Sequence, residues 1–135
     1  MTVSLITGGA GFIGSHVYDH LIKMDHKVIV LDDLSGGSIA NLPKDAIVVG
    51  GSILNTKLID ELFQMYHFDY VFHLAAYAAE GLSHFIRRYN CEVNVIGSVN
   101  LINAAVNYGV KRFVFTSSVA VYGLNAHGAG EHQTP

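Results

Sequence analysis

Three glycines at a strand-to-helix junction constrain this chain more than any other feature. The apolar run at residues 3–7 is followed by Gly8, Gly11 and Gly14, and an amphipathic helical pattern begins directly behind them. In such a turn one glycine permits the tight bend, another lets backbone approach phosphate oxygens, and the third lets the helix pack on the strand. The unpaired N–H groups at the start of the helix then face the anion. The segment therefore predicts a site for the pyrophosphate of a dinucleotide.

Apolar runs alternate with helical patterns along the chain. We expect strands at residues 3–7, 27–32, 46–49, 70–74 and 112–116, and helices at residues 12–24, 56–66 and 88–108. The continuous apolar runs are typical of strands buried on both faces, and their alternation with helices favours a parallel sheet with right-handed crossovers. The sequence thus predicts an α/β fold in which residues 1–135 form one domain. We expect a Rossmann-like, doubly wound parallel sheet of about five strands in the order 3-2-1-4-5, with helices on both faces. The ligand is expected at the carboxyl ends of strands one and four.

Each expected helix carries one apolar face. These faces comprise Ile13, Val17 and Leu21 in the first helix, Leu58, Leu62 and Met65 in the second, and Val95, Val99, Ile102 and Val106 in the third. Gly109 follows the third helix, at the position where a glycine often ends a helix.

Composition narrows the function classes further. Hydrophobic residues make up 50% of the chain and charged residues only 14%, against about 25% charged in typical soluble domains. No run is apolar for long enough to span a bilayer, and no signal peptide is expected. The apolar excess predicts surface that a partner chain, a missing domain or a dimer covers. The net charge of −3 argues against a nucleic-acid or anionic-membrane partner.

The single cysteine, Cys91, cannot form an internal disulfide. It indicates a reducing cytoplasm and a thiol that serves in packing.

Asp32 ends the second expected strand, 18 positions after Gly14. An acid there can accept hydrogen bonds from both ribose hydroxyls of an adenosine, and it repels a 2′-phosphate, so NAD is favoured over NADP. The alternative is that Asp32 only caps the end of a strand. Asp33 either contacts the ribose or adenine or is simply solvated.

Five segments, at residues 7–16, 31–35, 73–76, 94–98 and 116–123, together resemble one enzyme family and occur in its order. The chain resembles the N-terminal half of an extended short-chain dehydrogenase/reductase. Within that superfamily it is most similar to the NAD-dependent sugar-nucleotide epimerase/dehydratase family, of the UDP-glucose 4-epimerase type. The resemblance implies an NAD cofactor, a nucleotide-sugar substrate and a homodimer built on helix 88–108.

The resemblance also implies roles for single residues. Phe12 and Ile13 would give backbone N–H groups to the pyrophosphate. Leu74, Ala75 and Ala76 would pass under the cofactor at the end of the fourth strand, where small side chains suit the close approach of backbone to the dinucleotide. Asn94 would sit inside the long helix and hold neighbouring backbone in place.

Ser118, four residues before Tyr122, matches the catalytic Ser/Thr of the family, whose hydroxyl bonds the substrate hydroxyl that is oxidised. The alternative is a turn serine after a strand, with Ser117 and Thr116 as neighbouring candidates. Thr116 is also expected among the cofactor-binding residues.

The chain departs from the family after the third strand. The family usually has Gly-Asp-Ile or Gly-Asp-Leu there, and its acid meets the adenine amine; this chain has Gly51-Ser52-Ile53. Ser52 can accept a hydrogen bond but carries no charge, so a weaker adenine contact is expected. Ser52 and Ile53 are still expected at the cofactor site.

A larger departure concerns the Tyr-x-x-x-Lys dyad that transfers the proton in this family. None of the seven tyrosines has a lysine four residues later, and residues 131–135 resemble the loop that precedes the dyad. We therefore expect a chain that ends before its own catalytic base, lacks the substrate-binding region and is inactive alone. A non-catalytic NAD-binding module and a part of another reductase of the same superfamily stay open as alternatives. No metal site is expected.

Overall fold

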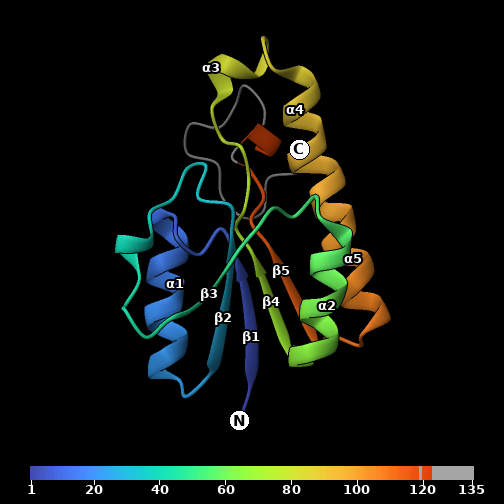
Figure 1. Ribbon diagram of the computed structural model, residues 1–135. Helices are drawn as coiled ribbons and strands as arrows, with labels where there is room; N and C mark the ends of the chain where they lie inside the picture. The colour runs from blue at the N-terminus through green and yellow to red at the C-terminus, as the bar shows by residue number, and fades with distance from the viewer. Residues whose placement is uncertain (119, 123–135) are drawn as a thin grey trace.

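A five-stranded parallel sheet forms the centre of the computed structural model, which describes residues 1–118 and 120–122 (Figure 1). The strand order is β3-β2-β1-β4-β5, which confirms the predicted topology. The strands are β1 (Val3–Thr7), β2 (Lys27–Asp32), β3 (Ile47–Gly50), β4 (Tyr70–His73) and β5 (Arg112–Phe115). Leu5 in β1 pairs with Ile29 on one side and Val71 on the other, and all three are fully buried.

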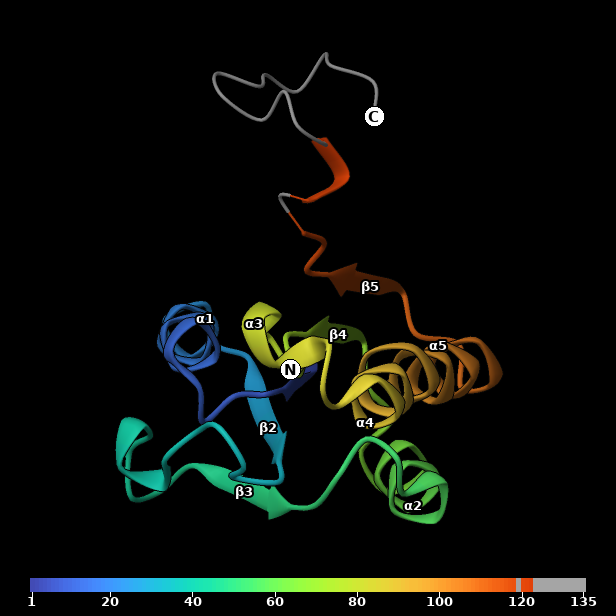
Figure 2. The same cartoon turned by 90° about the horizontal axis from the view of Figure 1, so that it is seen from above.

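Helices cover both faces of this sheet, as predicted. Figure 2 shows α1 (Phe12–Lys23) on one face and α2 (Thr56–Tyr66) with α5 (Ser98–Asn107) on the other. Two separate apolar cores follow from this layering. The core under α1 includes Ile6, Tyr18 and Val30, and the core under α2 and α5 includes Leu5, Phe63 and Leu101. The loops beyond the carboxyl ends of the strands build the site.

Two of the predicted helix faces are partly wrong. Ile13 is exposed, because α1 touches the strand-to-helix turn through Gly14 and so faces the sheet with Tyr18 and Leu21. Met65 is exposed, because the buried stripe of α2 is rotated onto Ile59, Leu62 and Phe63.

The expected helix at residues 88–108 consists of three parts. A short α4 (Arg87–Cys91) runs into a π-helix (Glu92–Gly97), which continues into α5. Figure 1 shows α4 extending beyond the carboxyl ends of the strands, and Cys91 is exposed there, so the predicted packing role of its thiol is wrong. The helix ends as expected, because Gly109 follows it with φ of +68°.

Two further short elements were not predicted, the 3-10 helix at Ile39–Asn41 and α3 (Glu80–Ser83). The expected strands ran one residue further at their carboxyl ends for β4 and β5, and β3 is shifted by one residue. Among the described residues, no helix is long and apolar enough to cross a membrane.

Candidate functional site

The glycine turn touches the segment that follows β4 backbone to backbone. Gly8 has φ of +71°, and a Cβ there would lie 2.7 Å from the Ala75 nitrogen and 2.8 Å from its Cα. A Cβ on Gly14 would lie 2.2 Å from the Gly8 carbonyl oxygen, while one on Gly11 would lie 3.2 Å from the same atom. The left-handed conformation of Gly8 and the close approach at Gly8 and Gly14 require the absence of a Cβ. Gly8 therefore permits the tight bend, Gly14 lets the helix pack on the turn, and the approach of this backbone to a phosphate stays a prediction.

The start of α1 presents free donors. Gly11 is the N-cap and provides no side-chain cap, and the first turn contains no acidic residue. In the described part of the chain, the N–H groups of Phe12, Ile13 and Gly14 have no hydrogen-bond partner. Unpaired N–H groups at a helix N-terminus attract anions, so this turn can hold a phosphate.

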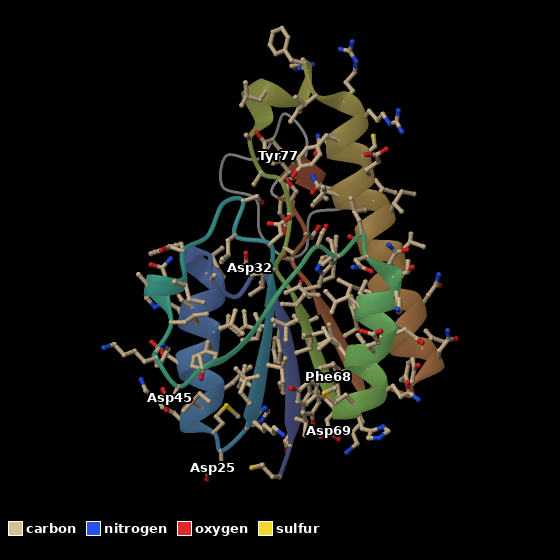
Figure 3. All side chains as sticks on the ribbon, in the orientation of Figure 1. Asp25, Asp32, Asp45, Phe68, Asp69 and Tyr77 are labelled. Atoms are coloured by element: carbon tan, nitrogen blue, oxygen red, sulfur yellow. The ribbon has the colours of Figure 1, made fainter. Side chains whose placement is uncertain are left out.

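Asp32 lies at the carboxyl end of β2, directly beside the glycine turn (Figure 3). It is only 8% exposed, and its two oxygens accept hydrogen bonds from the Ala10 N–H at 2.9 Å and the Leu34 N–H at 2.8 Å. Each oxygen retains a lone pair, and the carboxylate lines a hollow above the sheet. Asp32 therefore ties the glycine turn to the next loop and is also available to a ligand. Asp33 lines the same hollow, and its Oδ1 accepts hydrogen bonds from the N–H and hydroxyl of Ser35.

Ala10 anchors the loop that follows β2. Its carbonyl oxygen accepts hydrogen bonds from the Ser38 N–H at 3.0 Å and the Asn41 side-chain amide at 2.8 Å. Gly37 packs so closely on Ala10 that a Cβ there would lie 2.8 Å from its backbone. Sequence reasoning missed Asn41, because nothing in its local pattern distinguishes it from an ordinary turn residue.

Two hollows lie side by side above the carboxyl ends of the strands. The first has a volume of about 330 Å³ and is lined by Gly8, Gly11, Asp32, Asp33, Ser52 and Ile53, among others. The second has a volume of about 450 Å³ and is lined by Asn94, Thr116, Ser117 and Ser118, among others. Residues 75–79 line both hollows and form the wall between them, which we call the shared wall. The two hollows meet above β1 and β4, where the chain connections turn to opposite faces and where doubly wound sheets bind their ligands.

The structure therefore brings most of the predicted site residues around these two hollows. Leu74 lines the first hollow, and Ala75 and Ala76 belong to the shared wall. Phe12, Ile13 and Gly14 line neither hollow.

Ser52, where the chain departs from the sequence usual in the family, takes part in the turn before α2. Its hydroxyl oxygen accepts a hydrogen bond from the Leu54 N–H at 3.2 Å, which forms the turn that leads into α2. One lone pair and the hydroxyl proton of Ser52 remain available toward the first hollow. Ile53 is buried and packs under Gly97 of the π-helix.

Thr116 and Ser118 follow β5 at the rim of the second hollow. The Thr116 hydroxyl donates to the His73 carbonyl at 3.0 Å and continues the pairing of β4 with β5. The Ser118 hydroxyl oxygen accepts a hydrogen bond from the Ala120 N–H at 3.1 Å, so Ser118 is a turn serine. It lines the second hollow as well. Tyr122 is described, whereas residues 123–135, which contain the segment that resembles the loop before the dyad, lie outside the described residues.

A buried polar group joins the two central strands to α5. The imidazole of His73 in β4 lies 2.7 Å from the Thr7 hydroxyl through Nδ1 and 2.9 Å from the Ser98 hydroxyl through Nε2. His73 is 2% exposed, and burial lowers its pKa from 6.5 to about 4. The partners of His73, Thr7 and Ser98, could not be found from periodicity in the sequence.

The lowered pKa of His73 predicts how stability depends on pH. The unfolded chain takes up a proton near pH 6.5 and the folded chain only near pH 4, so the unfolded state binds more protons between these values. The contribution is complete above pH 6.5 and is lost as the pH falls toward 4. We expect the free energy of unfolding to fall by up to about 3 kcal/mol in this window, measured by urea unfolding at several pH values.

The titration of Asp69 falls outside the pH range in which His73 changes the stability. The Asp69 carboxylate accepts hydrogen bonds from the Lys111 ammonium at 2.7 Å and the Val3 N–H at 2.9 Å, and these hold its pKa below the ordinary 3.8. Its contribution is therefore lost only at lower pH. A stability that is constant between pH 7 and pH 4.5 would contradict the assignment to His73.

Comparison with known proteins identifies the family. The sequence profile of the NAD dependent epimerase/dehydratase family matches residues 4–135, which is nearly the whole chain. The chain belongs to this family. A UDP-glucose 4-epimerase of Halalkalibacterium halodurans is 39% identical over 121 residues, which are 88% of this chain and 35% of that protein.

Solved structures of family members agree with the fold. The UDP-glucose 4-epimerase of Thermotoga maritima, solved with UDP-glucose, superposes with a TM-score of 0.88 at 42% identity, over 92% of this chain and 40% of that one. The enzyme of Thermus thermophilus, solved with NAD, gives a TM-score of 0.92 at 35% identity, over 99% of this chain and 44% of that one. The chain thus spans less than half the length of each of these epimerases. In the described part of the chain, no group of three or more His, Cys, Asp or Glu residues could hold a metal ion.

Proposed function

We propose that the two hollows bind the two halves of NAD, with the adenosine in the first and the nicotinamide riboside in the second. The observation that carries this proposal is the free N-terminus of α1, which directly follows a glycine turn whose Gly8 and Gly11 line the first hollow. Asp32 would accept the ribose hydroxyls, and Ser52 would meet the adenine by a neutral hydrogen bond. The backbone of the shared wall would pass under the cofactor, where its alanines leave room. The Thermus thermophilus relative, which is solved with NAD, supports this assignment.

We further propose that the chain is the NAD-binding part of an enzyme of the UDP-glucose 4-epimerase type. NAD supplies a reversible acceptor for the hydride of a sugar carbon, so that a 4-keto sugar forms transiently. Ser118, at the rim of the second hollow, would orient the sugar hydroxyl that is oxidised, and Thr116 would hold the end of β5 against β4. The 135 residues contain no Tyr-x-x-x-Lys, so we propose that they bind NAD without turning over UDP-sugars.

Calorimetry on the 135-residue chain tests both parts of this proposal. We expect saturable NAD binding, and no conversion of UDP-galactose to UDP-glucose after prolonged incubation with NAD. Absence of NAD binding at millimolar concentration would contradict the first part, and clear epimerisation would contradict the second. Titration with a UDP-sugar, repeated after addition of the C-terminal half of a family enzyme, separates the alternatives. An epimerase part should bind the UDP-sugar once that half is present, whereas a pure NAD-binding module should not bind it in either case.

We also propose that the chain forms a homodimer through one helix face. Val95, Val99, Ile102 and Val106 form an exposed apolar stripe that runs from the π-helix along α5, while Leu101, Ala104 and Ala105 of the same helix face the sheet. A continuous exposed apolar stripe is typical of a contact surface. A reducing, cytoplasmic compartment is proposed on the single cysteine, Cys91.

Replacement of Ile102 by glutamate is expected to convert the dimer into a monomer, because it would bury a charge in the apolar interface. Ile22→Glu on α1 is the matched control, since Ile22 and Ile102 are both 44% exposed. Light scattering should show a dimer for the original chain and for Ile22→Glu, and a monomer for Ile102→Glu. A monomeric original chain at high concentration would contradict the proposed dimer.

A further inference from the structure

A chain of hydrogen bonds runs through the buried polar group and returns to the shared wall at both ends. At one end the Ala75 N–H donates to the Thr7 hydroxyl oxygen at 3.3 Å. At the other end the Ser98 hydroxyl donates to the Asn94 carbonyl at 2.7 Å. The Asn94 side chain then holds Tyr77 on both sides, because its Oδ1 accepts from the Tyr77 N–H at 2.7 Å and its Nδ2 donates to the Tyr77 carbonyl at 3.0 Å. His73 is the central member of this chain.

The directions of these hydrogen bonds are compatible with only one tautomer of the His73 imidazole. The one proton of the Ser98 hydroxyl is donated to the Asn94 carbonyl, so its oxygen can only accept from the Nε2–H of His73. In a neutral imidazole the other nitrogen is then an acceptor. Nδ1 accordingly accepts the Thr7 hydroxyl proton, which leaves the Thr7 oxygen free to accept from Ala75. Every member is satisfied in this single arrangement, and no described buried side-chain nitrogen or oxygen lacks a partner.

We infer that His73, as the neutral ring protonated at Nε2, is a positioning residue. It fixes the backbone of the shared wall at Ala75 and Tyr77 in the position that the dinucleotide needs. The inference rests on the proposed function, because it assumes that NAD passes over residues 75–77. Its physical basis is that a buried polar network is stable only when complete. Loss of the His73 ring would leave the Thr7 hydroxyl proton without its acceptor and the Ser98 oxygen without its Nε2–H donor, and we expect this to loosen the wall at Ala75 and Tyr77.

The chain contains a matched pair that serves as a control. The Ser4 hydroxyl lies 2.9 Å from Nδ1 of His26, and Ser4 is also fully buried in β1. This pair has the same chemistry as Thr7 and His73, but it lies at the opposite end of β1 and has no hydrogen bond to the shared wall. We expect removal of this pair to affect stability without affecting the hollows.

The experiment compares His73→Phe and Ser98→Ala with His26→Phe and Ser4→Ala, by amide hydrogen exchange and by NAD calorimetry. We expect both variants at residues 73 and 98 to accelerate exchange at Tyr77, and His73→Phe to accelerate it at Ala75 as well. We expect their Kd for NAD to rise about tenfold, which corresponds to about 1.4 kcal/mol, because the loss of a buried hydrogen bond in the network loosens the residues that hold the wall. The two controls should leave exchange at Ala75 and Tyr77, and the Kd, within about twofold once global stability is accounted for.

Unchanged exchange at Tyr77 in both His73→Phe and Ser98→Ala would overturn the inference. An imidazole nitrogen-15 spectrum of the original chain tests it without any variant. We expect a protonated Nε2 and an unprotonated Nδ1 at pH 7, and the opposite tautomer would also overturn it. If the original chain binds no NAD, the proposed function fails, and the exchange and nitrogen-15 measurements still decide whether His73 controls the wall.

Discussion

Replacement of Gly8 by alanine is expected to weaken NAD binding strongly and to destabilise the fold by about 3 kcal/mol. The φ of +71° disfavours any L side chain, and the new Cβ would lie within 2.9 Å of three backbone atoms of Leu74 and Ala75. Backbone atoms cannot rotate away as a side chain can, so the turn or the shared wall must shift. We expect the Kd for NAD to rise at least about a hundredfold, which corresponds to about 3 kcal/mol. Urea unfolding and calorimetry measure the two effects.

Gly50→Ala is the matched control for this change. Gly50 ends β3, has no positive φ, and a Cβ there would meet no atom within 4 Å. Its stability should change by less than about 1 kcal/mol and its NAD affinity by less than about threefold. Unchanged NAD affinity in Gly8→Ala would show that the turn does not position the cofactor.

Replacement of Asp32 by asparagine is expected to weaken NAD binding about thirtyfold and to reduce the preference for NAD over NADP. Asparagine retains one acceptor oxygen, so only one of the Ala10 and Leu34 N–H groups keeps its bond and the other is left facing an amide donor. The loss of one such bond and of the charge costs about 1–2 kcal/mol of stability. Calorimetry with NAD and NADP, together with urea unfolding, provides the measurement.

Asp33→Asn separates a general loss of charge from the specific role of Asp32. Asp33 lines the same hollow, but it is exposed and its hydrogen bonds stay within its own turn, to Ser35. We expect a change in Kd of less than about threefold. An equal or larger effect of Asp33→Asn, or equally tight binding of NADP by the original chain, would contradict the assignment of Asp32.

The features that could be predicted from the sequence are those set by local chemistry. The strand order followed from five continuous apolar runs that alternate with helices, since a parallel sheet buried on both faces leaves few other arrangements. The roles of Gly8 and Gly14 followed from their spacing, because a side chain at either position would meet backbone. Asp32 caps neighbouring backbone, as one of its two readings had it, and it also lines the first hollow, whereas its contact with a ribose stays a prediction.

The features that could not be predicted depend on contacts distant in the sequence. A helical pattern assumes 3.6 residues per turn, so it could not reveal the π-helix at Glu92–Gly97, which brings the Asn94 side chain to Tyr77. The exposure of Ile13 follows from the closeness of Gly14 to the turn, which is a tertiary contact. The partners of His73 lie 66 and 25 residues away. Small polar residues inside otherwise apolar runs, Thr7 and Ser98, were the only local sign of that network.

The central claim is that one dinucleotide occupies both hollows across the shared wall. Amide spectra of the nitrogen-15 labelled chain, recorded with AMP and then with NAD, test it most directly. AMP should shift the amides of the first hollow and of the free helix start, such as Asp33, Ser52 and Phe12. NAD should shift the same amides and, in addition, those of Asn94, Thr116 and Ser117 in the second hollow. NAD shifts confined to the first hollow, or located away from both hollows, would contradict the account.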